Sequence, residues 1–257
     1  MHTPSSTNVD TPLDSPSPIE IYDVVVVGAG PVGLATAIGL HQRGIQNILV
    51  IDQTRAFRQV GQVIDLLPNG LKALKYINLT AYEEVIKKSI NFSKQMPPEP
   101  ENISETRQEQ KPSKASHKWT QKNLKGQTIR SFSLNYEDWF KEYGEGRVSI
   151  AWYDLQATLR HQLPQDRVKP NHRCIDVVNE PELGCVRIDC VSDLGVEVNP
   201  YAHWTDRQTQ EDATSSNVEA ISQQLAKTSI RAKLVVAADG INSTVRRVLY
   251  ADSPYQA

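Results

Sequence analysis

This sequence contains few cysteines and has almost no net charge. Its 28 Lys and Arg residues nearly balance 30 Asp and Glu residues, which leaves a formal net charge of −2 and no dense basic run. This balance argues against nucleic acid or an anionic membrane as a partner. The six histidines show no metal-ligand spacing, so no metal site is predicted. The three cysteines are too few and too irregularly spaced for a zinc site or a disulfide framework and are expected to be reduced apolar fillers: Cys174, Cys185 and Cys190.

Long apolar runs are missing too. The longest, residues 24–40, is too short to span a bilayer comfortably and is interrupted by glycines, so no integral membrane segment is expected. Residues 1–20 are rich in Ser, Thr and Pro, which predicts a disordered leader and not a signal peptide. Two further polar segments, 91–127 and 200–228, are predicted to be largely flexible insertions. These features together predict a cytoplasmic chain.

Order is expected to begin with a βαβ unit. Tyr22–Val27 is a continuous β-branched run, typical of a strand buried on both faces of a parallel sheet. A glycine-rich turn follows, then a helix over Pro31–Gln42, with Pro31 in the first turn where its missing N–H costs nothing. A second buried strand, Ile48–Ile51, leads directly into Asp52. The fold class predicted from this unit is α/β with a parallel sheet.

The rest of the chain supplies further elements. A helix is expected to start at Pro68, and an amphipathic helix is expected over Tyr153–Leu163. Cys174–Val178 and Cys185–Val191 are expected to form an antiparallel pair of strands. The last strong strand is expected over Ile230–Ala238, before a short helix that Ser243 can cap.

The glycine-rich turn fits the dinucleotide fingerprint Gly-x-Gly-x-x-Gly. Gly28 permits a tight turn out of the strand, Gly30 allows a diphosphate to approach the backbone, and Gly33 allows close packing of helix on strand. The helix start at Pro31 and Val32 offers unpaired N–H groups to phosphate oxygens. Asp52 is expected to accept hydrogen bonds from the adenosine ribose. The fingerprint alone leaves NAD and FAD both open.

Two further segments resemble flavoprotein aromatic hydroxylases and their epoxidase relatives, the para-hydroxybenzoate hydroxylase-like family. Residues 234–246 resemble the family's buried strand that ends in Asp-Gly, here Asp239-Gly240, followed by Ser243 and Arg246. Residues 58–70 resemble its Arg-x-x-Gly segment, here Arg58 to Gly61. The resemblance implies a Rossmann-like FAD-binding domain with an inserted, incomplete antiparallel-sheet substrate domain.

The same resemblance implies an enzyme and its cofactors. FAD is expected to be bound, NAD(P)H to be the co-substrate, and a small organic molecule to be hydroxylated or epoxidised. No catalytic acid or base is assigned, and the oligomeric state is not indicated. The FAD-binding domain is expected over 21–90 and 145–257, with 91–144 a polar insertion and part of the substrate domain. The predicted cofactor-binding residues are Gly28, Gly30, Pro31, Val32, Gly33, Asp52, Gln53, Arg58, Asp239 and Gly240.

The sequence departs from the family pattern in three places. Trp152 stands where the family usually has Arg, and Gln53 follows Asp52 where Arg is common. A third signature, Gly-Asp, is missing, so the sequence resembles the N-terminal part of a longer monooxygenase. Two alternatives remain open: a flavin-dependent reductase or halogenase on the same fold, and a non-catalytic nucleotide-binding fragment.

Overall fold

The structure is a computed structural model that describes residues 20–90, 118–195 and 225–251. The predicted leader lies outside these residues apart from Glu20, as do residues 91–117 and 200–224 of the two predicted insertions. Within the described part, helices and strands are mixed along the chain, and the α/β class is confirmed.

The N-terminal βαβ unit forms as predicted. Strand β1 (Ile21–Val27) leads through the glycine-rich turn into helix α1 (Pro31–Gln42), and strand β2 (Ile48–Ile51) runs parallel to β1. The side chains of β1 from Val24 onward and all four of β2 are buried. Their β-branched and leucine side chains suit a central strand that is covered on both faces.

β1 and β2 belong to a sheet of six strands in the order β7-β2-β1-β10-β9-β8. The strands β7, β2, β1 and β10 are parallel, whereas β9 pairs antiparallel with β10 and β8 pairs antiparallel with β9. This confirms the predicted antiparallel pair, whose connection ends at Gly184 with φ +61°. The four strands not yet bounded are β7 (Val168–Lys169), β8 (Arg173–Glu180), β9 (Cys185–Asp193) and β10 (Leu225–Ala237).

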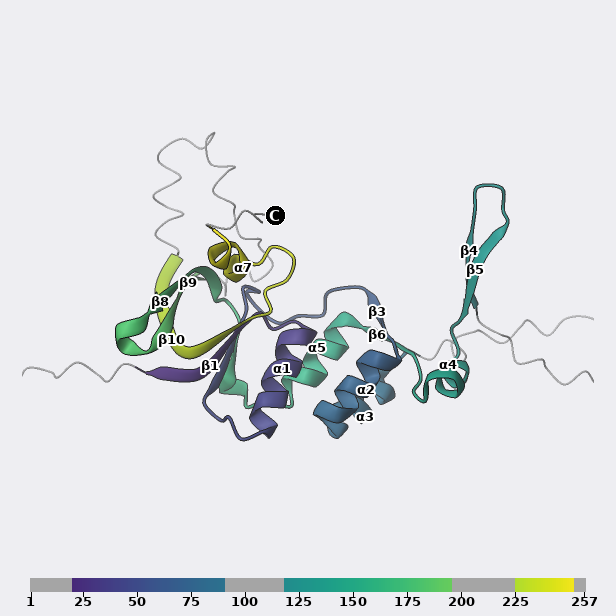
Figure 1. The fold of residues 1–257 in the computed structure, drawn as a ribbon, viewed down its shortest axis with the longest axis horizontal. Helices are drawn as coiled ribbons and strands as arrows, with labels where there is room; N and C mark the ends of the chain where they lie inside the picture. Colours follow the sequence, from purple (N-terminus) through teal and green to yellow (C-terminus); the bar gives the residue numbers. More distant parts are fainter. Residues whose placement is uncertain (1–19, 91–117, 196–224, 252–257) are drawn as a thin grey trace, which may run out of the picture.

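Each face of the sheet carries its own hydrophobic core. Alternate side chains of β1 point to opposite faces, so Val24 and Val26 join one core while Val25 and Val27 join the other. The first core includes residues of α1, α2 (Pro68–Ile77), α3 (Leu79–Lys88) and α5 (Trp152–Arg160). These helices lie together beside β1 in Figure 1. The second core includes Val245 of α7 (Thr244–Leu249).

A smaller part of the chain projects from this body. β3 (Val63–Leu66) pairs antiparallel with β6 (Val148–Ala151), and the chain between them includes α4 (Tyr136–Tyr143). Figure 1 shows a hairpin of β4 (Lys118–Lys122) and β5 (Thr128–Ser133) extending beyond α4. None of the helices in the described ranges is long and apolar enough to cross a membrane.

Three boundaries differ from the sequence-based predictions. β4 lies inside the polar segment 91–127, where its pairing with β5 and the stacking of Trp119 on Phe132, with ring centroids 5.7 Å apart, stabilise a strand. β10 begins at Leu225, inside the polar segment 200–228, because pairing with β9 continues as far as Leu225↔Asp193. Helix α5 begins at Trp152 and ends at Arg160, three residues short of the predicted end. Polar composition predicted flexibility in these segments, but β4 pairs with the next strand of its hairpin and β10 with β9, and this pairing makes both segments strands.

Candidate dinucleotide site

The glycine-rich turn is packed against the end of β10. Gly28 has φ +110°, a conformation that glycine adopts without steric cost. A Cβ atom on Gly28 would overlap the Ala238 carbonyl oxygen, and one on Gly33 would overlap the Gly28 carbonyl oxygen. Gly33 therefore lets helix and strand pack closely, as predicted, and Gly28 forms the predicted turn but also lies against Ala238, a contact that was not predicted.

Gly30 has a different environment from the other two glycines. Its φ of −72° and ψ of 172° are extended backbone, and it is the N-cap of α1. A Cβ atom there would find Trp152 Cη2 as its nearest neighbour, 4.0 Å away. Among the residues that the structure describes, none accepts a hydrogen bond from the Gly30 N–H. Gly30 thus presents open backbone beside the start of α1, as diphosphate binding requires.

Asp52 holds the turn in place through its carboxylate. One oxygen accepts a hydrogen bond from the Ala29 N–H at 2.6 Å, and the other accepts one from the Thr54 N–H at 2.7 Å. The sequence predicted bonds to ribose hydroxyls, and the intramolecular bonds to backbone were not foreseen. Each carboxylate oxygen can accept more than one hydrogen bond, so both functions are compatible.

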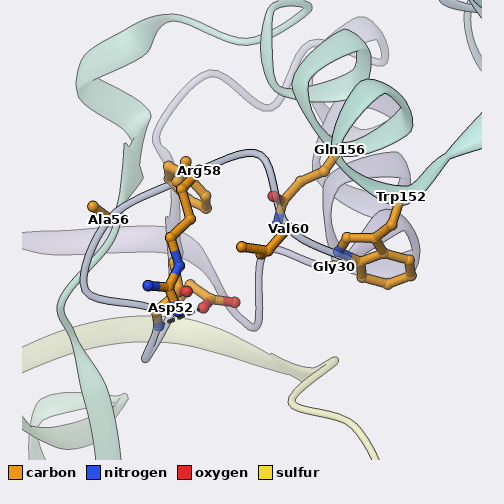
Figure 2. A pocket seen from close by; sticks show the side chains of 9 residues that line it. Gly30, Asp52, Ala56, Arg58, Val60, Trp152 and Gln156 are labelled. Atoms are coloured by element: carbon orange, nitrogen blue, oxygen red, sulfur yellow. Dashed lines mark hydrogen bonds between the residues drawn. The ribbon is translucent and has the colours of Figure 1, made fainter. Parts of the chain in front are cut away.

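A cavity of about 190 Å³ adjoins this turn. Figure 2 shows the side chain of Arg58 extending toward Asp52, with the Trp152 indole beside Gly30. Pockets for whole ligands typically measure about 300–1,000 Å³, so this cavity fits only a part of a dinucleotide. The residues that line it are Gly30, Asp52, Thr54, Ala56, Phe57, Arg58, Val60, Trp152 and Gln156.

Only three of the predicted site residues line this cavity: Gly30, Asp52 and Arg58. Pro31, Val32 and Gly33 form the first turn of α1 next to it, where Val32 is 75% exposed. Gln53 is exposed in the loop after β2 and does not line it. Asp239 and Gly240 follow Ala238, which lies against Gly28, and they do not line the cavity.

Asp239 caps helix α7. Its carboxylate accepts hydrogen bonds from the Ser243 hydroxyl at 2.6 Å and the Thr244 N–H at 2.7 Å. Ser243 accepts a bond from the Arg246 N–H, which confirms its predicted capping role. Gly240 has φ +81° and gives the chain the sharp exit from β10 that the sequence predicts. The Asp-Gly signature therefore builds the connection between β10 and α7.

Helix α5 contributes site residues that the sequence did not predict. The Gln156 amide donates a hydrogen bond to the Ala29 carbonyl at 2.8 Å, and the Trp152 side chain packs against Gly61. Gly61 has φ +108°, and a Cβ there would lie 2.8 Å from that of Trp152. The Arg160 guanidinium lies 4.3 Å from the centroid of the Phe57 ring. Trp152, Gln156 and Arg160 recur every fourth residue, so the sequence places them on one face of the helix, but it does not show that this face meets the site.

The loop after β2 is fixed by a buried ion pair. Arg55 Nη2 lies 2.5 Å from a carboxylate oxygen of Asp193, and both side chains are about nine-tenths buried. The Asn171 side chain donates to the Asp193 carbonyl and accepts from the Asp193 N–H, and Asn171 N–H donates to Thr54. This arrangement ties the end of β9 to the residues next to Asp52.

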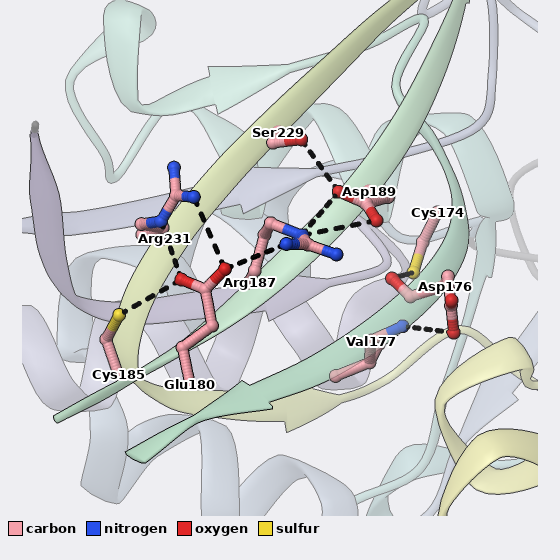
Figure 3. A network of polar contacts seen from close by, with 9 residues as sticks. All are labelled: Cys174, Asp176, Val177, Glu180, Cys185, Arg187, Asp189, Ser229 and Arg231. Atoms are coloured by element: carbon pink, nitrogen blue, oxygen red, sulfur yellow. Dashed lines mark hydrogen bonds and ion pairs between the residues drawn. The ribbon is translucent and has the colours of Figure 1, made fainter. Parts of the chain in front are cut away.

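A second polar cluster lies on the antiparallel part of the sheet (Figure 3). Glu180 accepts hydrogen bonds from Arg231 and Arg187, and Arg187 also bonds Asp189. The bond from Arg231 lowers the pKa of Glu180 below its ordinary value. Glu180 of β8 thus pairs with Arg187 of β9 and Arg231 of β10, so its carboxylate links the three antiparallel strands.

The cysteines offer no reactive group. All three are buried and unbridged, and burial raises the thiol pKa of Cys174 and Cys190 to about 12. These thiols stay protonated and act as apolar fillers, as the sequence predicted. Within the described ranges, no group of His, Cys, Asp or Glu side chains is arranged to hold a metal ion.

Comparison with known proteins matches residues 21–63 to the FAD-binding domain family. The chain is 38% identical over 61 residues to Monooxygenase 1 of Arabidopsis thaliana, a match that covers 24% of this chain and 15% of the relative. It is 35% identical over 57 residues to phenazine 1,6-dicarboxylic acid hydroxylase PhzS of Lysobacter antibioticus, covering 22% and 14%. The matched segments thus span less than a sixth of either relative.

The fold is also similar to that of solved structures. It resembles aklavinone-11 hydroxylase, solved with FAD and aklavinone, at TM-score 0.55 and 18% identity, over 89% of this chain and 34% of that chain. The sequence-based resemblance to FAD-dependent monooxygenases is therefore confirmed at the level of these matches: residues 21–63 are similar to an FAD-binding domain, and the two relatives are named a monooxygenase and a hydroxylase.

Proposed function

We propose that this chain is the Rossmann-like FAD-binding portion of an NAD(P)H-dependent flavin monooxygenase that hydroxylates or epoxidises a small organic substrate. One observation carries the proposal: the glycine-rich turn leaves Gly30 open while Gly28 packs against the Asp-Gly connection at Ala238. Two signatures more than two hundred residues apart in the sequence thus meet at one edge of the sheet. This is the edge at which α/β folds bind nucleotides.

The residues around the turn fit the ADP half of FAD. The open Gly30 backbone and the N-terminus of α1 suit the diphosphate, since helix N–H groups and the helix dipole favour an anion. Asp52 retains acceptor capacity for ribose hydroxyls. Arg58 and the aromatic residues Phe57 and Trp152 line the adjoining cavity, where cationic and apolar groups suit a nucleotide. The predicted contacts of Gln53, Asp239 and Gly240 with the cofactor stay predictions.

When bound, the flavin would supply the redox chemistry that links NAD(P)H oxidation to O₂. The residues of this chain bind and orient it. The Ala29 backbone is held from two sides by Asp52 and Gln156, so the diphosphate meets a pre-organised turn. The loop at 52–58 is held by the Arg55–Asp193 ion pair.

The domain division proposed from sequence assigns 21–90 and 145–257 to FAD binding and 91–144 partly to substrate binding. The projection of α4, β4 and β5 away from the six-stranded sheet supports this division (Figure 1). Several large apolar side chains in this projecting part are exposed: Trp119, Leu124, Ile129, Phe132, Phe140 and Tyr143. Such a surface suits a region that packs against substrate or against further protein.

The test is to purify the chain, record its visible absorbance and titrate it with FAD and with ADP. NAD(P)H oxidation is then measured with and without O₂, and oxygenated product is sought with small aromatic and alkene substrates. Binding of ADP, weak binding of FAD and no oxygenated product from this portion alone are the expected results, because the cavity holds only a part of the dinucleotide. NAD(P)H oxidation that proceeds equally well without O₂, with another electron acceptor becoming reduced, would point to a reductase. A chain that binds neither FAD nor ADP would refute nucleotide binding.

A further inference from the structure

The Ala29 backbone is held at both of its polar groups. Its N–H donates to Asp52 at 2.6 Å, and its carbonyl accepts from the Gln156 amide at 2.8 Å. Ala29 is fully buried, whereas Gln156 comes from α5, more than a hundred residues later in the chain. Figure 2 shows Gln156 extending from α5 toward the turn.

The bond to the Ala29 carbonyl also determines where the next N–H points. The Ala29–Gly30 peptide is trans, so its carbonyl and its N–H point in opposite directions. While Gln156 binds the carbonyl, the Gly30 N–H faces away from Gln156. Within the described part of the chain this N–H has no acceptor, which leaves it available to a ligand.

The flanking glycine makes this orientation easy to lose. Gly30 has no Cβ and can adopt positive φ values at little cost, so the Ala29–Gly30 peptide can rotate. Rotation would turn the carbonyl oxygen toward the position of the diphosphate and place two negative groups together. A donor that holds the carbonyl opposes this rotation.

We propose that Gln156 is a positioning residue of the dinucleotide site, which keeps the Gly30 N–H directed at the diphosphate by holding the Ala29 carbonyl. This inference rests on the proposed function, because it assumes that a dinucleotide binds at the turn. It assigns a role to a polar side chain on α5 that does not itself need to touch the ligand.

The test compares four variants by calorimetric titration with FAD and with ADP. Gln156→Met preserves length and removes the donor, and we expect both ligands to bind about tenfold more weakly. Gln156→Glu replaces the donor with an acceptor and is expected to weaken both further. Gln156→Lys restores a donor and should recover affinity to within about threefold of wild type. The matched control is Gln162→Met, two residues past the end of α5, where the amide donates to the Thr158 carbonyl and affinity should change by less than about twofold.

A spectroscopic readout separates positioning from general stability. In ¹H–¹⁵N spectra, the Gly30 amide signal should move on ADP addition in wild type and in Gln156→Lys, and move less in Gln156→Met. Thermal unfolding without ligand monitors the stability of each variant.

Three outcomes would overturn the inference. If wild type binds ADP and FAD but Gln156→Met and Gln156→Glu bind them equally well, the positioning role is wrong while the proposed function stands. If Gln162→Met loses as much affinity as Gln156→Met, the effect belongs to helix stability. If wild type binds neither ligand, the proposed function fails and this inference fails with it.

Discussion

Gly30→Val separates ligand binding from folding at the glycine-rich turn. The backbone at Gly30 is extended, with φ −72°, so valine can adopt it without strain. A Cβ there meets nothing closer than the Trp152 ring at 4.0 Å. Loss of a favourable N-cap glycine costs about 1 kcal/mol or less, so the thermal unfolding of the free protein should change little.

Binding should respond much more strongly to the same change. The isopropyl group would occupy the space through which a diphosphate approaches the Gly30 and helix N–H groups. A hydrogen bond to a charged acceptor contributes about 1.5–3 kcal/mol, so losing two such bonds weakens binding by about 3–6 kcal/mol. This corresponds to at least a hundredfold increase in the dissociation constant for FAD or ADP.

Gly28→Ala is the matched comparison. Gly28 has φ +110°, and its Cβ would overlap the Ala238 carbonyl oxygen, so this smaller substitution must displace β10. Backbone strain and overpacking predict a loss of about 2–5 kcal/mol in the free energy of unfolding. Calorimetric titration and thermal unfolding of both variants provide the check. Wild-type affinity in Gly30→Val, or greater destabilisation by Gly30→Val than by Gly28→Ala, would refute the reasoning.

Three further predictions concern the surrounding structure. Arg55→Met leaves Asp193 buried without its ion-pair partner and should lower the free energy of unfolding by about 3–5 kcal/mol, measured by urea denaturation; an unchanged midpoint would contradict this. Asp239→Ala removes the acceptor for the Ser243 hydroxyl and the Thr244 N–H and should cost about 1–2 kcal/mol, with amide exchange in α7 accelerated and exchange in α1 unchanged. Burial alone would raise the pKa of Glu145, but hydrogen bonds from the Gly146 N–H, Tyr136 and Tyr82 outweigh burial and lower that pKa. The ionised carboxylate therefore stabilises the folded protein. This stabilisation is fully present above the unfolded pKa of about 4.3 and is lost as pH falls through the folded pKa. Glu145→Gln should therefore lose less stability on acidification from pH 6 than wild type does; parallel pH profiles of the two proteins would disprove this.

Local sequence patterns were enough to predict the elements that build the site. The β-branched run before Gly28, the Pro31 helix start and the strand ending at Asp52 each depend on neighbouring residues, and α1 and β2 have the predicted bounds. The same holds for the cap at Ser243 and the exit at Gly240. These features follow from backbone preferences and capping chemistry that act within a few residues.

The remaining part of the site required the three-dimensional arrangement. Gln156 was part of an amphipathic helix in the sequence, and nothing local connected it with Ala29. The sequence analysis assigned Asp52 to the ribose alone. Its bond to the Ala29 N–H could not be predicted, because that bond depends on how closely the turn lies to the end of β2. Residues in 118–122 and 225–228 were expected to be flexible from their polarity, although pairing with β5 and β9 makes them strands.

The sequence by itself determined the nucleotide fingerprint and the α/β class, since spacing of glycines and β-branched runs encodes both locally. Only the tertiary structure decided that Gly28 rests on Ala238, that Gln156 and Asp52 hold Ala29 from two sides, and that Gln53 stands apart from the cavity. The physical reason is that each of these contacts joins groups from distant parts of the sequence, which lie close together only once α1, α5 and the sheet that contains β2 and β10 have been assembled. Hydrogen bonds and steric contacts act over a few ångströms, so they exist only once distant segments have been placed.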